Sequence, residues 1–273
     1  MKHFEYEISG IDGSAAKFVG YCLDNSEEVV PDRVRPSVLV IPGGGYEMTS
    51  DREAEPIAMQ FFAAGFNAFV LRYSVKPSVF PVALLEAADA MKMICEHAAE
   101  WHVDPNAIAV IGFSAGGHLA ANLATSASDD VLAAHGYDPD AVRPNGLMLA
   151  YPVITSGPLA HRGSFDSLLG GRRNDPETLE SVSIEHHIDT KTPPVFVWHT
   201  VPDEIVPYEN TLMMIDACKK AGVSVEAHLF PQGGHGLSLG TAETAWQGVD
   251  GIEPSMQIWT QLAVAWMRRT FAR

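Results

Sequence analysis

The stretch AVIGFSAGGHLAAN, residues 109–122, passes from an apolar run through a glycine-rich turn into an alanine-rich segment. Its centre, Gly112-Phe113-Ser114-Ala115-Gly116, has the spacing G-x-S-x-G. We expect a strand before the serine and a helix after it, and so abrupt a turn strains the backbone at its apex. Side chains two positions away would collide, which explains a glycine on each side. The hydroxyl then points outward, beside the N–H groups of the helix N-terminus. A turn that only packs a helix against a strand is the alternative.

The segments around this turn alternate between short apolar runs and helix-like stretches, a pattern typical of a mostly parallel sheet with helices on both faces. The predicted strands of this sheet are residues 37–42, 66–75, 107–113, 146–152, 194–200 and 223–230. The predicted helices are residues 53–65, 81–102, 115–127, 208–222 and 255–271. Residues 3–8 and 16–23 alternate in polarity, which predicts an antiparallel hairpin at the sheet edge. Residues 153–190 break the rhythm, and we expect a small cap-like insertion over the active site of one domain spanning residues 1–273.

Composition narrows the class of protein. The 273 residues are 47% hydrophobic and 19% charged, as in an ordinary globular domain. Acidic residues outnumber basic ones by 34 to 18, and the net charge of −16 disfavours nucleic acid and anionic membranes as partners. The N-terminus has no apolar signal-peptide core, and the three widely spaced cysteines indicate no disulfide framework. We therefore expect a cytoplasmic protein with a small-molecule substrate, and a homo-oligomer is compatible with the sequence.

A nucleophilic serine needs a base to take its proton and an acid to orient that base. In sheets of this type the acid and then the histidine follow the serine along the chain. The loop 198–207, WHTVPDEIVP, follows a predicted strand and offers Asp203 and its neighbour Glu204. The loop 230–239, FPQGGHGLSL, follows the last predicted strand and places His235 among glycines. Either carboxylate could serve chemically, so the sequence leaves both open. Both loops lie at the sheet edge where α/β proteins bind ligands.

Acyl transfer also requires N–H donors for the negative oxygen of the tetrahedral intermediate. Gly43, Gly44 and Gly45 follow the first central strand, and without β-carbons their backbone can approach a substrate closely. The N–H of Ala115, directly after the serine, is the other candidate. A flexible turn is the alternative for the triple glycine. The phosphate-binding patterns G-x-x-x-x-G-K-[ST] and G-x-G-x-x-G are absent, and the histidine spacings give no metal site.

Together, SVLVIPGGGY, GFSAGGHLA, WHTVPDEIVP and GGHG resemble the α/β-hydrolase superfamily, and within it the bacterial carboxylesterase and acetyl xylan esterase-like group. That group is related to the hormone-sensitive-lipase type, whose HGGG loop has histidine where this chain has Pro42. The proline fits esterases with a P-G-G-G-Y loop. The resemblance implies no cofactor. It implies that Ser114 is the nucleophile, Asp203 the acid, His235 the base, and Gly44, Gly45 and Ala115 the oxyanion donors.

We therefore expect a serine esterase that hydrolyses short acyl esters, acetyl esters in the first place, on carbohydrate or a similar alcohol. An arylformamidase or a serine peptidase of the same fold is the alternative within the enzyme class. A non-catalytic binding protein with a hydrolase fold is the alternative outside it, and such proteins usually lose a member of the triad, whereas this sequence retains all three candidates.

Overall fold

The computed structural model describes residues 1–272, and an eight-stranded sheet runs through them in the order β1-β2-β4-β3-β5-β6-β7-β8. The pairs from β4 through β3, β5, β6 and β7 to β8 are parallel, while β1 and β2 run antiparallel at one edge. The expected mostly parallel sheet and its edge hairpin are both confirmed. The strands are β1 (Lys2–Ser9), β2 (Ala15–Cys22), β3 (Arg35–Ile41), β4 (Asn67–Arg72), β5 (Val103–Phe113), β6 (Gly146–Ala150), β7 (Val195–Thr200) and β8 (Val225–Phe230).

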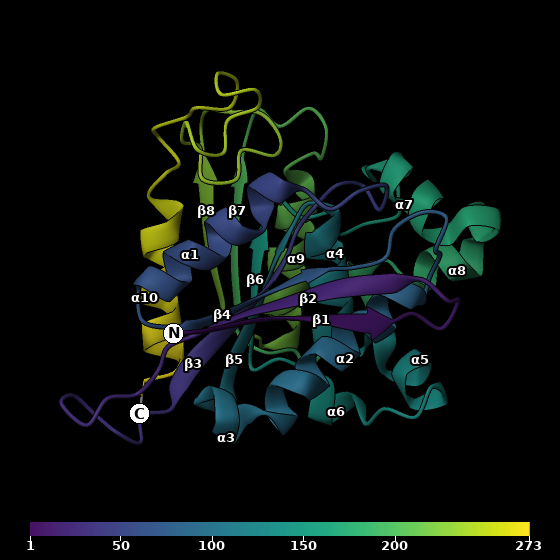
Figure 1. Ribbon diagram of the computed structural model, residues 1–273. Coiled ribbons are helices and arrows are strands. Elements are labelled where there is room, and N and C mark those ends of the chain that lie inside the picture. The colour runs from purple at the N-terminus through teal and green to yellow at the C-terminus, as the bar shows by residue number, and fades with distance from the viewer. Residues whose placement is uncertain (273) are drawn as a thin grey trace.

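Helices cover both faces of this sheet (Figure 1). Helices α1 and α10 pack against one face, and α2, α4 and α9 pack against the other. The α-helices are α1 (Glu55–Ala63), α2 (Val82–Glu96), α3 (Ala98–Trp101), α4 (Ala115–Ala124), α5 (Asp129–Ala134), α6 (Pro139–Val142), α7 (Arg162–Leu169), α8 (Pro176–Ser181), α9 (Glu209–Ala221) and α10 (Trp259–Thr270). The short 3-10 helices are η1 (Asp51–Glu53), η2 (Ser126–Ser128), η3 (Gly170–Arg172) and η4 (Ile184–His186).

The apolar runs of the central strands are buried because successive side chains point to opposite faces, and both faces are covered. In β3, Val38 and Val40 pack toward α1 and α10, whereas Leu39 and Ile41 pack toward α2 and α4. All four side chains are fully buried. The strand that leads into the glycine loop at residues 43–45 is therefore held between two hydrophobic layers.

Several elements differ in their bounds from the sequence expectation, and two of them differ for a visible reason. The helix expected over 81–102 divides at His97 into α2 and α3, and the ring of His97 stacks on Trp101 at 4.5 Å. Strand β5 begins at Val103, earlier than expected, because Val103 pairs with Arg35 before an irregularity shifts the register. The Asp-Pro-Asn sequence after Val103 is typical of a turn and hid this early pairing.

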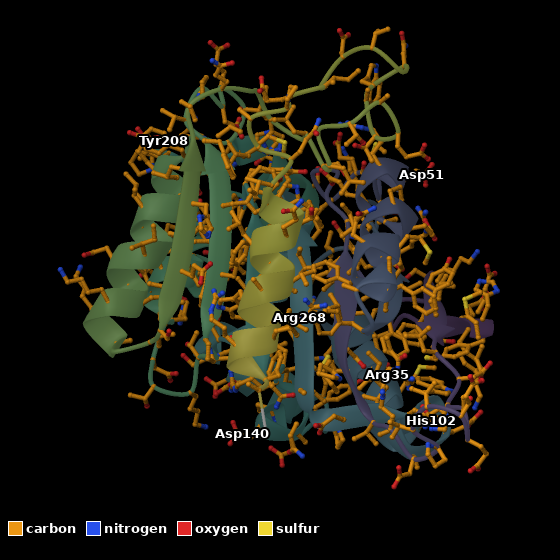
Figure 2. All side chains as sticks on the ribbon, turned by 90° about the vertical axis from the view of Figure 1, so that its left-hand side faces the viewer. Arg35, Asp51, His102, Asp140, Tyr208 and Arg268 are labelled. Atoms are coloured by element: carbon orange, nitrogen blue, oxygen red, sulfur yellow. The ribbon has the colours of Figure 1, made fainter. Side chains whose placement is uncertain are left out.

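The carboxyl ends of the parallel strands meet at one edge of the sheet. In Figure 2, Asp51 and Tyr208, which follow β3 and β7, lie at the upper edge, while His102 and Asp140, which precede β5 and β6, lie at the opposite edge. Between β6 and β7, residues 153–190 form α7, η3, α8 and η4 instead of a single covering helix.

Candidate active site

Ser114 lies at the turn between β5 and α4, in a backbone conformation that L-residues rarely adopt. Its φ is 52° and its ψ is −119°, which costs free energy of order 1–3 kcal/mol and persists only where the surroundings impose it. Here the N–H of Ser114 donates to the carbonyl of Ala150, and its own carbonyl accepts from the N–H groups of His118 and Val153. The neighbouring strand β6 and the chain after it therefore hold the strained turn in place.

The two flanking glycines are required for a direct steric reason. A β-carbon on Gly112 would lie 2.2 Å from the carbonyl oxygen of Gly116. A β-carbon on Gly116 would lie 2.3 Å from the carbonyl oxygen of Pro42. Both obstacles are backbone atoms and cannot swing aside, so the serine turn packs against itself and against the glycine loop after β3.

The serine, histidine and aspartate candidates lie close together although they follow three different strands, β5, β8 and β7 respectively. The Oγ of Ser114 lies 2.8 Å from Nε2 of His235, and Nδ1 of His235 lies 2.6 Å from Oδ2 of Asp203. Because a carboxylate oxygen only accepts, Nδ1 carries the proton, and Nε2 of the neutral ring is free to accept from the serine hydroxyl. This is the hydrogen-bond order that activates a serine.

Asp203, and not Glu204, holds the acid position. Asp203 is 6% exposed, and Glu204 points into solvent. The Oδ1 atom of Asp203 accepts from the N–H groups of Ile205 and Val206 at 2.9 Å each. Burial alone raises the pKa of Asp203, but the hydrogen bonds from His199 and His235 outweigh it and hold that pKa well below its ordinary value. The carboxylate is therefore ionised and oriented at neutral pH.

The glycine loop after β3 lies beside the serine with free N–H groups. Gly44 and Gly45 have φ values of +131° and +65°, a region that suits glycine. Within residues 1–272, the N–H groups of Gly44, Gly45 and Ala115 donate to no protein acceptor. The N–H of Gly43, by contrast, donates to Oε2 of Glu53 at 2.8 Å. The N–H groups expected as oxyanion donors are therefore available, whereas the N–H of Gly43, which precedes two of them, is already bonded to Glu53.

Three residues support the site although no sequence motif singled them out: Glu53, Tyr151 and His199. Glu53 is 4% exposed, and its Oε1 accepts from the hydroxyl of Tyr151 at 2.6 Å. The ring of Tyr151 packs edge-on against His235, with ring centroids 5.1 Å apart. His199, near the end of β7, bonds to Oδ2 of Asp203 at 3.1 Å. Tyr151 and His199 stand at the ends of strands, which was the only sequence signal for them. Glu53 gave no signal, because an acidic residue just before a helix is usually exposed.

A cleft of about 360 Å³ opens onto these groups. His161, from the segment between β6 and β7, lines it, and burial together with the nearby His235 lowers the pKa of His161. An exposed Trp246 forms part of the rim, with the guanidinium of Arg52 at 5.8 Å from its ring. The cleft lining comprises Gly44, Gly45, Glu47, Met48, Ser50, Arg52, Glu53, Ser114, His161, Ile205, His235, Gly236 and Trp246.

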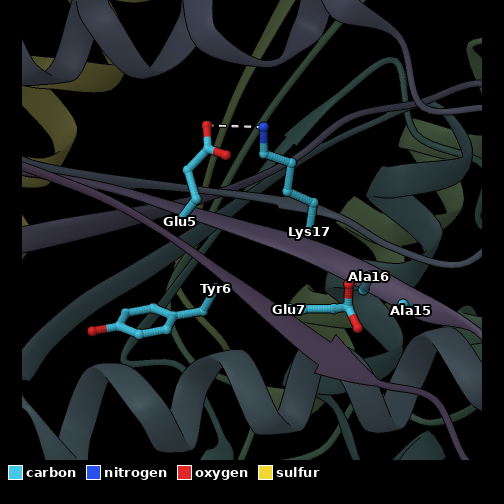
Figure 3. A pocket seen from close by; sticks show the side chains of 6 residues that line it. All are labelled: Glu5, Tyr6, Glu7, Ala15, Ala16 and Lys17. Atoms are coloured by element: carbon cyan, nitrogen blue, oxygen red, sulfur yellow. Dashed lines mark ion pairs between the residues drawn. The ribbon is translucent and has the colours of Figure 1, made fainter.

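A separate hollow lies over the β1–β2 hairpin, away from these groups (Figure 3). Lys17 and Glu5 form an ion pair of 2.9 Å across it, and no residue of the candidate site lines it. Among residues 1–272, no set of three or more histidine, cysteine, aspartate or glutamate side chains is arranged to hold a metal ion. In the same part of the chain, no helix combines the length and the apolar character that a bilayer crossing needs.

A parallel sheet with a serine, a histidine and a carboxylate hydrogen-bonded beyond its strand ends defines the α/β-hydrolase class. The model of the BD-FAE family matches residues 28–217, so the chain belongs to the BD-FAE family. The expected kinship with carboxylesterases and acetyl xylan esterases is confirmed by similar proteins. The chain is 36% identical over 230 residues to endo-1,4-beta-xylanase B of Butyrivibrio fibrisolvens, covering 83% of this chain and 36% of that protein.

Two further relatives carry ester chemistry in their names. The acetylxylan esterase of Xylanibacter ruminicola is 28% identical over 210 residues, covering 75% of this chain and 42% of that protein. The crystal structure of the acetyl ester-xyloside bifunctional hydrolase from Caldicellulosiruptor lactoaceticus superposes with a TM-score of 0.80 at 36% identity, covering 94% of this chain and 88% of that one. The chain spans less than half the length of the two curated relatives named here.

Proposed function

We propose that the protein is a serine esterase that removes short acyl groups, acetyl in the first place, from a carbohydrate or a similar small alcohol. The observation that carries the proposal is the unbroken relay from the Ser114 hydroxyl through His235 to Asp203, at 2.8 and 2.6 Å. The names of the relatives, acetylxylan esterase and acetyl ester-xyloside hydrolase, support acetyl esters as the substrate class.

The mechanism follows from the proton positions. Nε2 of His235 takes the proton of the Ser114 hydroxyl as Oγ attacks the ester carbonyl, and Asp203 stabilises the imidazolium that forms. The N–H groups of Gly44, Gly45 and Ala115 stabilise the oxyanion. Collapse of the tetrahedral intermediate breaks the bond to the alcohol oxygen, which receives the proton from Nε2. Water, deprotonated by the same nitrogen, then attacks the acyl carbonyl. The bond to Oγ breaks, the acid is released, and Nε2 returns the proton to Oγ of Ser114.

The decisive experiment compares wild-type protein and Ser114→Ala on p-nitrophenyl acetate. Wild-type turnover and its loss in the variant, with an unchanged circular dichroism spectrum, support the proposal. Undiminished turnover in Ser114→Ala contradicts it. Failure of a fluorophosphonate to label folded wild-type protein would favour a non-catalytic binding protein.

Substrate profiling separates the esterase from its rivals of the same fold. Faster turnover of an N-formyl arylamine than of acetyl esters would indicate an arylformamidase, and cleavage of peptide anilides a serine peptidase. We expect acetylated sugars to be preferred over both. A cytoplasmic location, the absence of nucleic-acid and membrane partners, the absence of a cofactor and the oligomeric state stay predictions.

A further inference from the structure

We infer that Glu53 is a positioning residue that holds the glycine loop and the histidine loop of the active site in register with each other. The inference rests on the proposed esterase function and assigns Glu53 no contact with the reacting atoms. It stands on four contacts made by two buried side chains, Glu53 and Tyr151.

The first contact joins Glu53 to the glycine loop. Oε2 of Glu53 accepts from the N–H of Gly43 at 2.8 Å, while the carbonyl of Gly43 accepts from the N–H of Ser50 at 2.9 Å. A β-carbon on Gly43 would lie 3.0 Å from Cβ of Ser114, so Gly43 packs directly against the nucleophile. Since Gly43 is pinned on both sides, the N–H groups that follow it at Gly44 and Gly45 have a fixed position relative to Ser114.

The second set of contacts joins Glu53 to the histidine loop through Tyr151. The hydroxyl of Tyr151 donates to Oε1 of Glu53 at 2.6 Å and accepts from the N–H of Ser238 at 3.0 Å. Ser238 follows His235 by three residues, and the Tyr151 ring also packs edge-on against the imidazole. Tyr151 is fully buried with φ of +37°, so its place is set by the surrounding structure.

Both oxygens of Glu53 act as acceptors, which an ionised carboxylate can do and an amide cannot. In Glu53→Gln, one arm of the side chain becomes an NH₂ donor. It meets either the N–H of Gly43 or the hydroxyl of Tyr151, which already accepts from Ser238. One buried contact is therefore lost or inverted, although the side chain keeps its size. Arg52, which directly precedes Glu53, does not take over the role of the carboxylate, because its guanidinium donates to the carbonyls of Gly236 and Thr244.

The same cleft offers a matched control. Glu47 also lines it, but its side chain is 62% exposed and pairs with Lys76 at 3.2 Å instead of with the glycine loop. Glu53→Gln and Glu47→Gln remove the same charge from the same cleft. Only the first disturbs the contact with Gly43 or with Tyr151, so a difference between the two variants reports positioning and not the field of a negative charge.

The test measures kcat and KM on p-nitrophenyl acetate for wild type, Glu53→Gln, Glu47→Gln and Ser114→Ala, with circular dichroism for each. We expect kcat of Glu53→Gln to fall by about 10- to 100-fold, somewhat less than the loss of a whole oxyanion donor. KM should stay within about twofold, because ground-state binding does not use the oxyanion donors. Affinity for a trifluoromethyl ketone, which forms a tetrahedral adduct with the serine, should fall with kcat. Glu47→Gln should lose clearly less kcat than Glu53→Gln, because it leaves the contacts of Glu53 with Gly43 and Tyr151 intact.

A folded Glu53→Gln with wild-type kcat, or an equal loss of kcat in Glu47→Gln, overturns the inference. If Glu53→Gln does not fold, Tyr151→Phe carries the test, since it removes one partner of Glu53 and leaves Gly43 bonded. A lower kcat at unchanged KM then supports the inference and an unchanged kcat overturns it. If neither variant folds, the network serves folding instead of positioning, which also overturns it. Inactive wild type or active Ser114→Ala would defeat the proposed esterase itself, whereas activity lost in Ser114→Ala and kept in Glu53→Gln defeats only the role of Glu53.

Discussion

His199 and His235 bond to the same oxygen atom, Oδ2 of Asp203. The distances are 3.1 Å from Nε2 of His199 and 2.6 Å from Nδ1 of His235. His199 is fully buried, and its Nε2 also lies 3.0 Å from the carbonyl of Val206. Since both neighbours of that nitrogen are acceptors, it carries a proton and donates. His199 thus holds the carboxylate of Asp203 in place, and that carboxylate orients His235 through the hydrogen bond at Nδ1.

Removing this anchor should lower the proposed esterase activity without abolishing it. In His199→Ala, Asp203 loses a charge-assisted hydrogen bond of about 1.5–3 kcal/mol, so we expect lower stability and a lower kcat. His199→Gln can still donate to Oδ2 and should recover part of both. Urea unfolding and steady-state kinetics on the pair measure this, and equal kcat for His199→Ala and wild type would contradict it.

Asp203 and Glu204 should differ sharply in their effect on turnover. Asp203→Asn keeps the shape but allows the wrong tautomer of His235, and in a serine triad this substitution lowers kcat by about 10⁴-fold. Glu204 is exposed and bonds to nothing in the relay, so Glu204→Gln should leave kcat close to wild type. Kinetics on p-nitrophenyl acetate decide between them. A crippled Glu204→Gln beside an active Asp203→Asn would reverse the assignment of the acid.

His118 should make stability depend on pH. Burial lowers the pKa of His118 from 6.5 to about 4, although the hydrogen bond to the Val182 carbonyl opposes that shift. In the unfolded chain, His118 therefore binds a proton below about pH 6.5. In the folded protein, its imidazole stays neutral until the pH falls to about 4. Stability is lost as the pH falls through this window, by an amount on the order of 3 kcal/mol for this one group.

The measurement is urea unfolding of wild type and His118→Gln at neutral pH and near pH 4. The variant cannot titrate at this position. As the pH is lowered, its free energy of unfolding should therefore decrease less steeply than that of the wild type. The ten other histidines, the remainder of the 11 in the chain, are common to both proteins and cancel in the comparison. Parallel stability curves would show that His118 is not the group responsible.

Gly112→Ala should damage the serine turn. Its new methyl group would lie 2.2 Å from the carbonyl oxygen of Gly116, and backbone overpacking of this kind costs about 1–3 kcal/mol or more. We expect a lower melting temperature and loss of turnover. Gly171→Ala is the control, since a β-carbon there meets nothing within 4 Å. Similar melting temperatures for the two variants would contradict this account of the turn.

The sequence predicted those parts of the molecule in which one residue type has one physical reason. Apolar runs gave the central strands, and the glycines around Ser114 gave the turn because nothing larger fits. It did not identify Glu53, because an acid becomes a buried anchor only when Gly43 and Tyr151 arrive from distant segments. It left Asp203 and Glu204 open for the same reason: which carboxylate turns inward depends on the backbone N–H groups of Ile205 and Val206. Properties set by long-range contacts are invisible to local patterns.

The position of β5 in the sheet has a consequence for heat inactivation. Ser114 directly follows β5, a strand that is flanked by β3 and β6 and buried on both faces near this end. His235 follows β8, a partly exposed strand at the edge of the sheet. Amide exchange is slowest in such interiors and fastest at such margins. Warming should therefore detach the imidazole while the serine strand is still intact. Early loss of activity would then be a local event that cooling reverses, ahead of any collapse of the whole domain.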